Sequence, residues 1–180
     1  MLSEQSSRAS RTEKGQTLIE LIIVITVGII IVSALTFATI STLRNANFAK
    51  NQAQATKLAQ EALERVRTGR DRDVSPIGGS FTITGNAVTS WSDPDMWRSI
   101  AGTCSLNAYF TVDPTGLLSY VACSTPIPST IITANGFTTA IMLSDSAATS
   151  GSEKTATAIV SWSDFSGTHN SRLTTVLRKL

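Results

Sequence analysis

Hydrophobic residues follow three successive patterns along the 180-residue chain. The first is a run of about 23 residues, from Leu18 to Ile40, in which nearly every side chain is apolar or small. As a helix this run would measure roughly 35 Å, which is enough to cross a hydrocarbon core of roughly 30 Å. A secretory signal has a shorter apolar core that ends in a cleavage site. We therefore expect a retained membrane-spanning helix.

The second pattern has a helical period and an Ala-rich face. No Pro or Gly occurs from Arg44 to Thr68, and good helix formers dominate this segment. Residues at spacings of seven, four, three and four mark one face: Phe48, Ala55, Ala59, Ala62 and Val66. The sequence predicts one continuous helix from about Thr17 to Thr68, with Gly69 as the residue that follows it. This face must pack against a sheet or against neighbouring subunits.

The third pattern, beyond Gly69, is typical of β-strands. A two-residue hairpin signal, Gly85-Asn86, and a type I turn signal, Asp113–Gly116, each separate two short strands. The last three strands are closely spaced, so an antiparallel meander is their simplest arrangement. The predicted strands are residues 81–84, 87–91, 106–112, 117–123, 137–143, 155–162 and 172–177. The predicted connectors are residues 125–130, 144–154 and 163–170.

Charge is unevenly distributed, although the formal net charge is only +2. Seven Lys and Arg residues face three acidic residues between Arg44 and Arg72. From Asp73 to Ser171 only Arg98 and Lys154 face seven acidic residues. Residues 44–72 thus form a basic stem, and the residues after them form a mildly acidic head. An acidic head gives little support to binding of DNA phosphates, which needs clustered Lys and Arg.

The two cysteines, Cys104 and Cys123, both lie in the part of the chain that we expect outside the membrane. In an oxidising compartment such a pair favours a disulfide, with two free buried thiols as the alternative. With 18 residues between them, a disulfide would contribute on the order of 3 kcal/mol of stability. Two cysteines and one histidine are too few ligands for a Cys/His zinc site.

A charged segment meets the apolar run at Lys14, and one carboxylate, Glu20, lies inside the edge of the run. An ionised group in hydrocarbon costs several kcal/mol unless it is paired, so Glu20 requires a partner. Arg8, Arg11 and Lys14, offset by Glu4 and Glu13, give a weak positive excess before the run. This excess favours a cytoplasmic N-terminus.

The segment Gly15-Gln16-Thr17-Leu18-Ile19-Glu20, followed by the apolar helix, closely resembles the cleavage and methylation site of type IV prepilins. Residues 58–67 and 158–164 are similar, less specifically, to minor pilins of the PilV type. The resemblance implies that a membrane prepilin peptidase cuts between Gly15 and Gln16 and N-methylates Gln16. It also implies that the mature chain moves from the membrane into a helical filament. The residues implied in peptidase recognition and assembly are Thr17, Leu18, Ile19 and Glu20.

Two positions depart from the family pattern. Most members have Phe as the first mature residue, where this chain has Gln16. Many major pilins also have a helix-kinking Pro at the position of Phe37. Without Pro, the helix has no strong reason to kink there.

Cleavage would create an amino group at Gln16, about 6 Å along the helix from Glu20. This amine stays cationic when methylated, so we hypothesise that Glu20 pairs with the new N-terminus of an adjoining subunit during assembly. The alternative is that Glu20, one turn into the span, reaches water at the membrane interface.

Other chemistry-bearing residues have simpler interpretations. His169, near Asp164 and several serines, is expected in a solvated turn rather than in a catalytic triad. Asp93-Pro94-Asp95 lacks the spaced ligands of a calcium loop and predicts a surface turn. Three tryptophans are expected in core or edge packing, with an exposed stacking cluster as the alternative; they are Trp91, Trp97 and Trp162. The basic segment 65–72 predicts a solvated helix end.

The sequence therefore predicts an α+β fold in which a long N-terminal helix, half of it transmembrane, packs on an antiparallel β-sheet head. The expected parts are a leader (1–15), the helix (16–68, about 17–41 transmembrane) and an exported head (69–180). We expect a structural minor pilin without enzymatic activity, cofactor or metal, first in the cell membrane and then in an extracellular pilus.

The expected partners are other pilins, the prepilin peptidase and the inner-membrane assembly platform. Three alternatives stay open at this point. The chain could be a pseudopilin of a type II secretion or DNA-uptake system, since these share every N-terminal feature. It could be a tip-located adhesion module that binds DNA or a glycan, or a plain single-pass anchored ectodomain.

Overall fold

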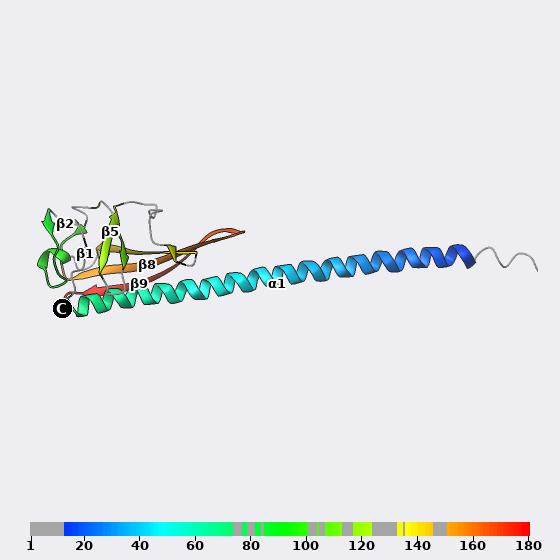
Figure 1. Cartoon of the computed structure of the whole chain (residues 1–180), viewed down its shortest axis with the longest axis horizontal. Helices are drawn as coiled ribbons and strands as arrows, with labels where there is room; N and C mark the ends of the chain where they lie inside the picture. The colour runs from blue at the N-terminus through cyan, green and yellow to red at the C-terminus, as the bar shows by residue number, and fades with distance from the viewer. Residues whose placement is uncertain are drawn as a thin grey trace, which may run out of the picture. The chain divides into compact units, whose positions relative to one another are not determined.

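A computed structural model describes residues 13–73, 77–78, 82–83, 85–100, 104, 107–112, 117–123, 133–134, 136–145 and 151–180. The chain divides into two compact units, Met1–Ala49 and Lys50–Leu180. One helix, α1 (Glu13–Asp71), supplies the described part of the first unit and the beginning of the second (Figure 1). The continuous helix predicted from the sequence is confirmed, and it extends a few residues further at both ends.

The end of α1 lies beyond the predicted position. Gly69 was expected to follow the helix, but the helix continues through it to Asp71. The residue with left-handed backbone is Asp73, with φ of 50°. The Asp73 carboxylate accepts hydrogen bonds from the backbone N–H and the hydroxyl of Ser92, both at 2.9 Å. This tertiary contact fixes the helix end, and a Gly preference alone could not reveal it.

The second unit contains a mainly antiparallel sheet. Among the described residues seven strands form it, in the order β1-β5-β4-β7-β8-β9, with β6 paired to β7. Only the short β1–β5 pair is parallel among the described ladders. The strands are β1 (Ile77–Gly78), β4 (Ala108–Val112), β5 (Leu118–Ala122), β6 (Thr133–Ala134), β7 (Phe137–Asp145), β8 (Glu153–Asp164) and β9 (Gly167–Arg178). The predicted β7–β8–β9 meander is confirmed.

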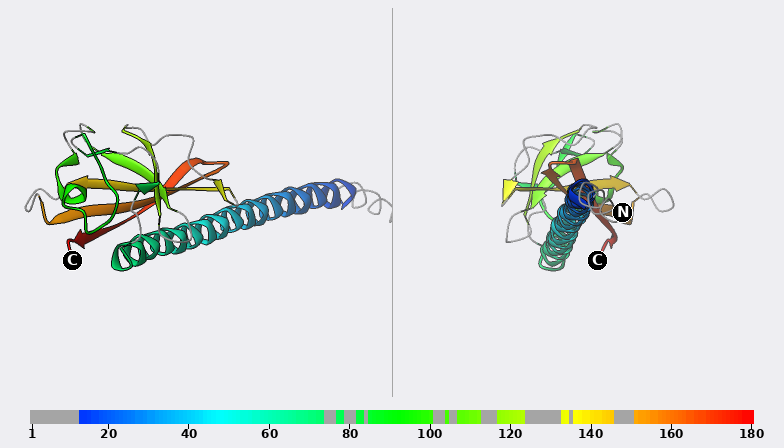
Figure 2. Two further views of the ribbon diagram at one scale, coloured as in Figure 1. Left: turned by 60° about the vertical axis from the view of Figure 1, so that its left-hand side comes forward. Right: turned by 90° about the vertical axis from the view of Figure 1, so that its right-hand side faces the viewer.

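The β8–β9 hairpin is longer than predicted. Residues 163–170 were expected to be a connector, yet most of them belong to two twelve-residue strands. Asp164 pairs with Gly167, whose φ of 134° suits glycine, so the turn consists of Phe165 and Ser166. The Ser- and Thr-rich composition concealed these strands, because hydroxyl side chains pair across strands as well as in turns. Figure 1 shows the hairpin extending beyond the shorter strands of the sheet, and Figure 2 gives two further views of it.

Two other predicted hairpins are present, one of them in a different register. β4 and β5 pair antiparallel, which confirms the hairpin, and Val112 pairs with Leu118. The turn residues 113–116 and the connector 125–130 lie outside the described residues. In the small β2–β3 ladder (Thr82–Ile83 and Asn86–Ala87), Ile83 pairs with Asn86. Gly85 thus ends the turn instead of beginning it, because its φ of 86° fills the left-handed position there.

The core of the second unit lies between the C-terminal part of α1, from Ala55 onward, and one face of the sheet. Ala55, Ala59, Ala62 and Val66 are at most 3% exposed, which confirms the predicted Ala-rich face. Phe48 is 42% exposed and lies in the first unit, so it is not part of this core. Trp91, Trp97 and Trp162 are at most 4% exposed, as expected for core residues. The fold is an α+β, type IV pilin-like architecture.

Candidate functional site

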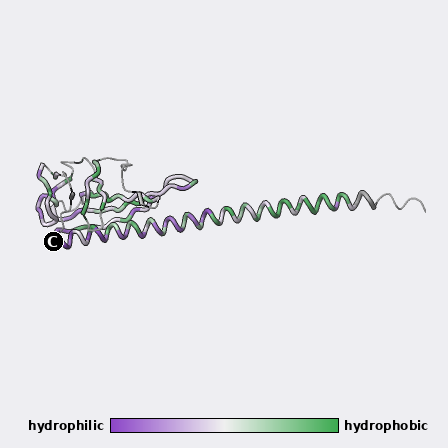
Figure 3. The backbone as a smooth tube through the Cα atoms, viewed as in Figure 1, coloured by the Kyte–Doolittle hydropathy of each residue, from purple (hydrophilic) through white to green (hydrophobic). Residues whose placement is uncertain are grey.

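The N-terminal part of α1 exposes a mainly apolar surface. From Leu18 to Leu43 its large apolar side chains are between 44% and 76% exposed. Figure 3 shows this stretch as hydrophobic, in contrast to the polar helix that follows. Within the part of the chain that the structure describes, α1 is the one helix long and apolar enough to cross a membrane. Such a surface requires lipid or other apolar helices to cover it.

Glu20 is the only charged residue from Leu18 to Ile40, and its side chain is exposed on α1. It makes no ion pair with another described side chain. Gly15 and Gln16 lie one turn earlier in the same helix, and Thr17, Leu18 and Ile19 are exposed between them and Glu20. The structure therefore places the predicted recognition residues on one helical turn, with a carboxylate at its end. Residues 1–12 lie outside the described residues.

Four threonine side chains of α1 are satisfied within the helix itself. Thr26, Thr36, Thr39 and Thr42 each donate a hydrogen bond to the carbonyl four residues earlier, at 2.7–2.9 Å. Transfer of a hydroxyl without a hydrogen-bond partner from water into hydrocarbon costs roughly 2–7 kcal/mol. These bonds make the threonines compatible with a membrane or with an apolar helix bundle.

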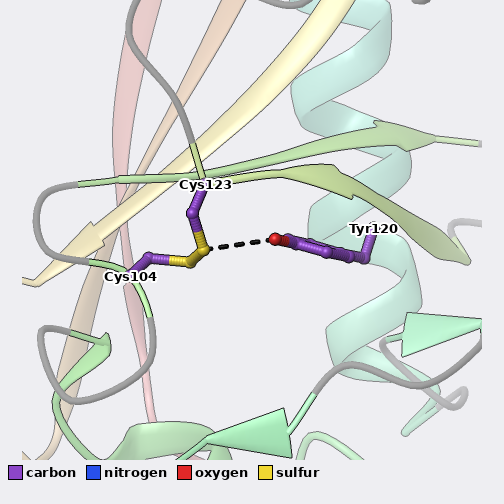
Figure 4. Close-up of a disulfide and its surroundings, with 3 residues drawn as sticks. All are labelled: Cys104, Tyr120 and Cys123. Atoms are coloured by element: carbon purple, nitrogen blue, oxygen red, sulfur yellow. Dashed lines mark hydrogen bonds between the residues drawn. A yellow bond between two sulfur atoms is a disulfide. The ribbon is translucent and has the colours of Figure 1, made fainter.

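The two cysteines form a disulfide in the second unit, as predicted. Cys104 precedes β4 and Cys123 follows β5, so the disulfide closes the open end of that hairpin. Figure 4 shows the Tyr120 hydroxyl donating a hydrogen bond to Cys123 Sγ, at 3.2 Å. Cys104 is buried and Cys123 is exposed. The arrangement is a structural clamp on one hairpin.

His169 was expected in a solvated turn, but it lies half-buried on β9, with its ring against Trp162. Its Nε2 atom is 3.0 Å from Ser166 Oγ and 3.1 Å from Asp164 Oδ1. A triad places the hydroxyl and the carboxylate on different ring nitrogens, whereas here both lie at the same one. The Ser166 hydroxyl also donates to Asp164. The cluster thus stabilises the turn and is not arranged for catalysis.

The other acidic candidates have structural roles. Asp93 caps the short 3₁₀ helix η1 (Pro94–Trp97), because its carboxylate accepts from the Asp95 backbone N–H. This bond and those from Thr89 lower the pKa of Asp93, against a smaller opposing effect of burial. No group of three or more potential metal ligands occurs among the described residues.

One ion pair with a buried lysine was missed by sequence reasoning. Lys154 was assigned to a connector, but it is 1% exposed on β8 and forms a salt bridge with Asp145. Its Nζ atom also donates to the carbonyl of Arg98, while Asp145 accepts from Ser99 and from the backbone of Ile100. The alternation of Lys154 with Ala156 and Ala158 was the signal for an inward-facing position.

The basic helix end is largely neutralised by neighbours. Arg65 pairs with Glu61, Arg67 with Glu64 and Arg70 with Asp71. This agrees with the expected solvated helix end. Because each pair has at least one exposed member, these pairs contribute little to stability, typically about 0–1 kcal/mol each.

Comparison with known families gives one match, to the prokaryotic N-terminal methylation motif, over residues 10–36. Neither the curated proteins nor the solved structures gave a match to this chain. The matched residues include the Gly15–Gln16 junction, Glu20 and much of the exposed apolar surface of α1. The motif and this apolar helix support membrane anchoring. The match supports a type IV pilin-like prepilin, that is, a pilin or pseudopilin processed by prepilin peptidase.

Proposed function

We propose that the protein is a structural minor pilin that prepilin peptidase cuts between Gly15 and Gln16. The mature chain then primes or joins a type IV filament through α1. The observation that carries the proposal is one carboxylate, Glu20, on an otherwise apolar and exposed helix that bears the methylation motif.

Processing divides the chain into a leader (1–15), a mature helix (16–68) and an exported head (69–180). Before assembly, about residues 17–41 span the membrane, with the N-terminus in the cytoplasm. The partners are other pilins, the peptidase and the inner-membrane assembly platform. Methylation of Gln16 leaves its amine cationic.

The Gln16 amine and Glu20 provide a means of setting register in the filament. The amine lies about 6 Å along the helix axis from Glu20 of its own chain. Pairing between adjoining subunits neutralises both groups in an apolar surrounding. A buried charge that loses its partner costs roughly 3–5 kcal/mol, so a subunit docked out of register is disfavoured. The exposed Leu, Ile and Val side chains supply the remaining cohesion.

The test combines processing with incorporation into sheared filaments. We expect N-terminal mass analysis of wild-type filaments to show a chain that begins at Gln16, with a methyl group on its amine. Glu20→Ala and Glu20→Gln chains should be cut normally but recovered in filaments at a strongly reduced level. Glu64→Ala is the matched control, because Glu64 is an exposed glutamate of the polar part of the same helix; it should incorporate like the wild type.

Two results would contradict the proposal. A mature protein that retains Met1 in cells with active peptidase would exclude the processing step. Normal incorporation of both Glu20 variants would exclude the pairing role of Glu20, even where cleavage occurs.

A further inference from the structure

The last strand of the sheet has a long free edge. β9 is twelve residues long and pairs with β8 on one side, and no other described strand pairs with it (Figure 1). Most strands in globular proteins have about five or six residues. β9 therefore leaves an unusually long row of backbone groups without a neighbouring strand.

The hydrogen-bonding pattern determines which backbone groups of β9 point to this edge. Just beyond the strand, the Lys179 N–H donates to the Ser152 carbonyl at 2.8 Å. In an antiparallel pair, alternate residues bond to the neighbouring strand, and the residues between them point away from it. Because the β8–β9 register is unbroken along the whole ladder, this bond sets the pattern for all of β9. The outward-pointing N–H and C=O groups, here called the free edge, belong to Thr168, Asn170, Arg172, Thr174 and Val176.

The contacts with α1 leave the free edge open. Side chains of α1 reach β9 at the hydroxyls of Ser171 and Thr175, which are odd-numbered residues on the core face of the strand. The Arg70 guanidinium donates to the next outward carbonyl, that of Arg178, which agrees with the pattern. No hydrogen bond from another described residue reaches the backbone groups of the free edge.

This edge lacks the usual features that prevent strand addition. Native proteins protect edge strands by making them short, by placing Pro or a bulge in them, or by covering them. β9 contains no Pro, and its ladder with β8 has no register shift. A long and regular edge of this kind can accept a further strand.

The side chains beside the free edge indicate the chemistry of that strand. β9 contains two arginines and no acidic residue. Arg178 pairs with Glu153, whereas Arg172 is exposed and makes no ion pair with another described residue. Residues directly opposite each other on adjacent strands interact, and opposite charges there are favourable. The incoming strand should therefore place a carboxylate opposite Arg172.

A second copy of β9 does not meet this requirement. It has no carboxylate to place opposite Arg172, and pairing two β9 strands would bring like charges together. Arg172 thus disfavours self-pairing and favours an acidic partner. Val176, which is 50% exposed four residues further along, favours an apolar residue opposite it.

We propose that the free edge of β9 binds an extended acidic segment of another protein by antiparallel strand addition. Antiparallel pairing is the more stable arrangement per residue. The backbone groups of the free edge supply the attachment, and the side chains opposite Arg172 and Val176 supply the selectivity. The site lies in the head and goes beyond the proposed role of α1 in a filament.

Amide hydrogen exchange at single-residue resolution tests the site in the full-length protein in detergent. The probe is a synthetic peptide with Val, Thr and Glu at alternate positions. One matched peptide has Lys in place of Glu, and another has N-methyl groups on the amides that would face β9. In the free protein, Arg172 and Thr174 should exchange faster than Leu173 and Thr175, whose N–H groups bond to β8. The Glu peptide should slow the even-numbered amides several-fold, and the two matched peptides should have much smaller effects.

A charge reversal gives the second part of the test. Arg172→Glu changes an exposed side chain, and unchanged protection of the Leu173 amide shows that the variant is folded. This variant should bind the Lys peptide several-fold more tightly than the Glu peptide. The matched control is Lys57→Glu, which makes the same change of charge at an exposed lysine of α1. It should keep the preference of the wild type for the Glu peptide.

Three outcomes would overturn the proposal. They are slow exchange of the even-numbered amides in the free protein, equal effects of the Glu and Lys peptides on the wild type, and slowing by a higher protein concentration alone. The last result would indicate self-pairing of β9. Cleavage at Gly15 and entry into filaments are scored separately, so a failure of this site leaves the proposed function standing.

Discussion

Lys154 shows how strongly a single residue depends on its neighbours. Its side chain is 1% exposed, and its charge is balanced by Asp145 and by the carbonyl of Arg98. Asp145 in turn accepts from the Ser99 hydroxyl at 2.7 Å and from the Ile100 N–H at 2.8 Å. The pair thus holds the segment after η1 against the β7–β8 hairpin.

Removing the buried cation should destabilise the head. Lys154→Met keeps most of the side-chain volume but leaves Asp145 without its counter-charge, so we expect a loss of about 3 kcal/mol. Chemical unfolding of the full-length protein in detergent, followed by tryptophan fluorescence, measures this loss. The control is Lys57→Met, because Lys57 is an exposed lysine of α1. It should stay within about 0.5 kcal/mol of the wild type. An equal effect of both substitutions would exclude the structural role of the pair.

The same pair gives stability a defined pH dependence. Burial raises the pKa of Asp145, but the bonds from Lys154, Ser99 and Ile100 outweigh burial and lower it overall. A carboxyl whose pKa is lower in the folded state stabilises the fold above its ordinary value, and this contribution is lost as the pH falls. Below about pH 4, the unfolding free energy of Asp145→Asn should therefore fall less steeply than that of the wild type. Parallel curves for the two proteins would contradict this assignment.

The contact between α1 and the sheet depends on small side chains. Ala59 is fully buried, with Ala55 and Ala62 one turn away on either side. Ala59→Leu should overpack this contact and cost about 1–3 kcal/mol in unfolding free energy. Gln60→Leu introduces the same side chain at an exposed position of the same helix and should change stability by less than about 0.5 kcal/mol. Equal unfolding midpoints for the two variants would show that the contact tolerates the larger residue.

Local sequence signals determined most elements but not their ends. The helix and the β7–β9 strands were predictable, because long periodic patterns dominate their sequences. The end of α1 at Asp71 depends on a hydrogen bond to Ser92, nineteen residues beyond Asp73, which no local pattern encodes. The β8–β9 extension was missed for a similar reason, since its Ser and Thr side chains are satisfied across the hairpin.

At the scale of the molecule, the candidate site was easier to predict than the head. The Gly15–Glu20 segment can be recognised from the sequence, because a lone carboxylate in an apolar helix is costly and therefore rare. The alternation of Lys154 with Ala156 and Ala158 indicates an inward-facing position, but it does not reveal the partners of the Lys154–Asp145 pair. Arg98 lies 56 residues from Lys154, and Ser99 lies 46 residues from Asp145. These contacts depend on the tertiary fold and could not be inferred from spacing alone.

The internal bonding of the four threonines in α1 bears on how a subunit changes surroundings. A hydroxyl that is hydrogen-bonded within its own helix needs no hydrogen-bond partner from lipid or from a neighbouring helix. A helix of this kind leaving lipid for a bundle of like helices breaks no polar bond on the way. The transfer then exchanges one set of dispersion contacts for another of similar strength. Under the proposed pairing, Glu20 differs from these threonines, because its carboxylate gains a counter-charge only in the filament.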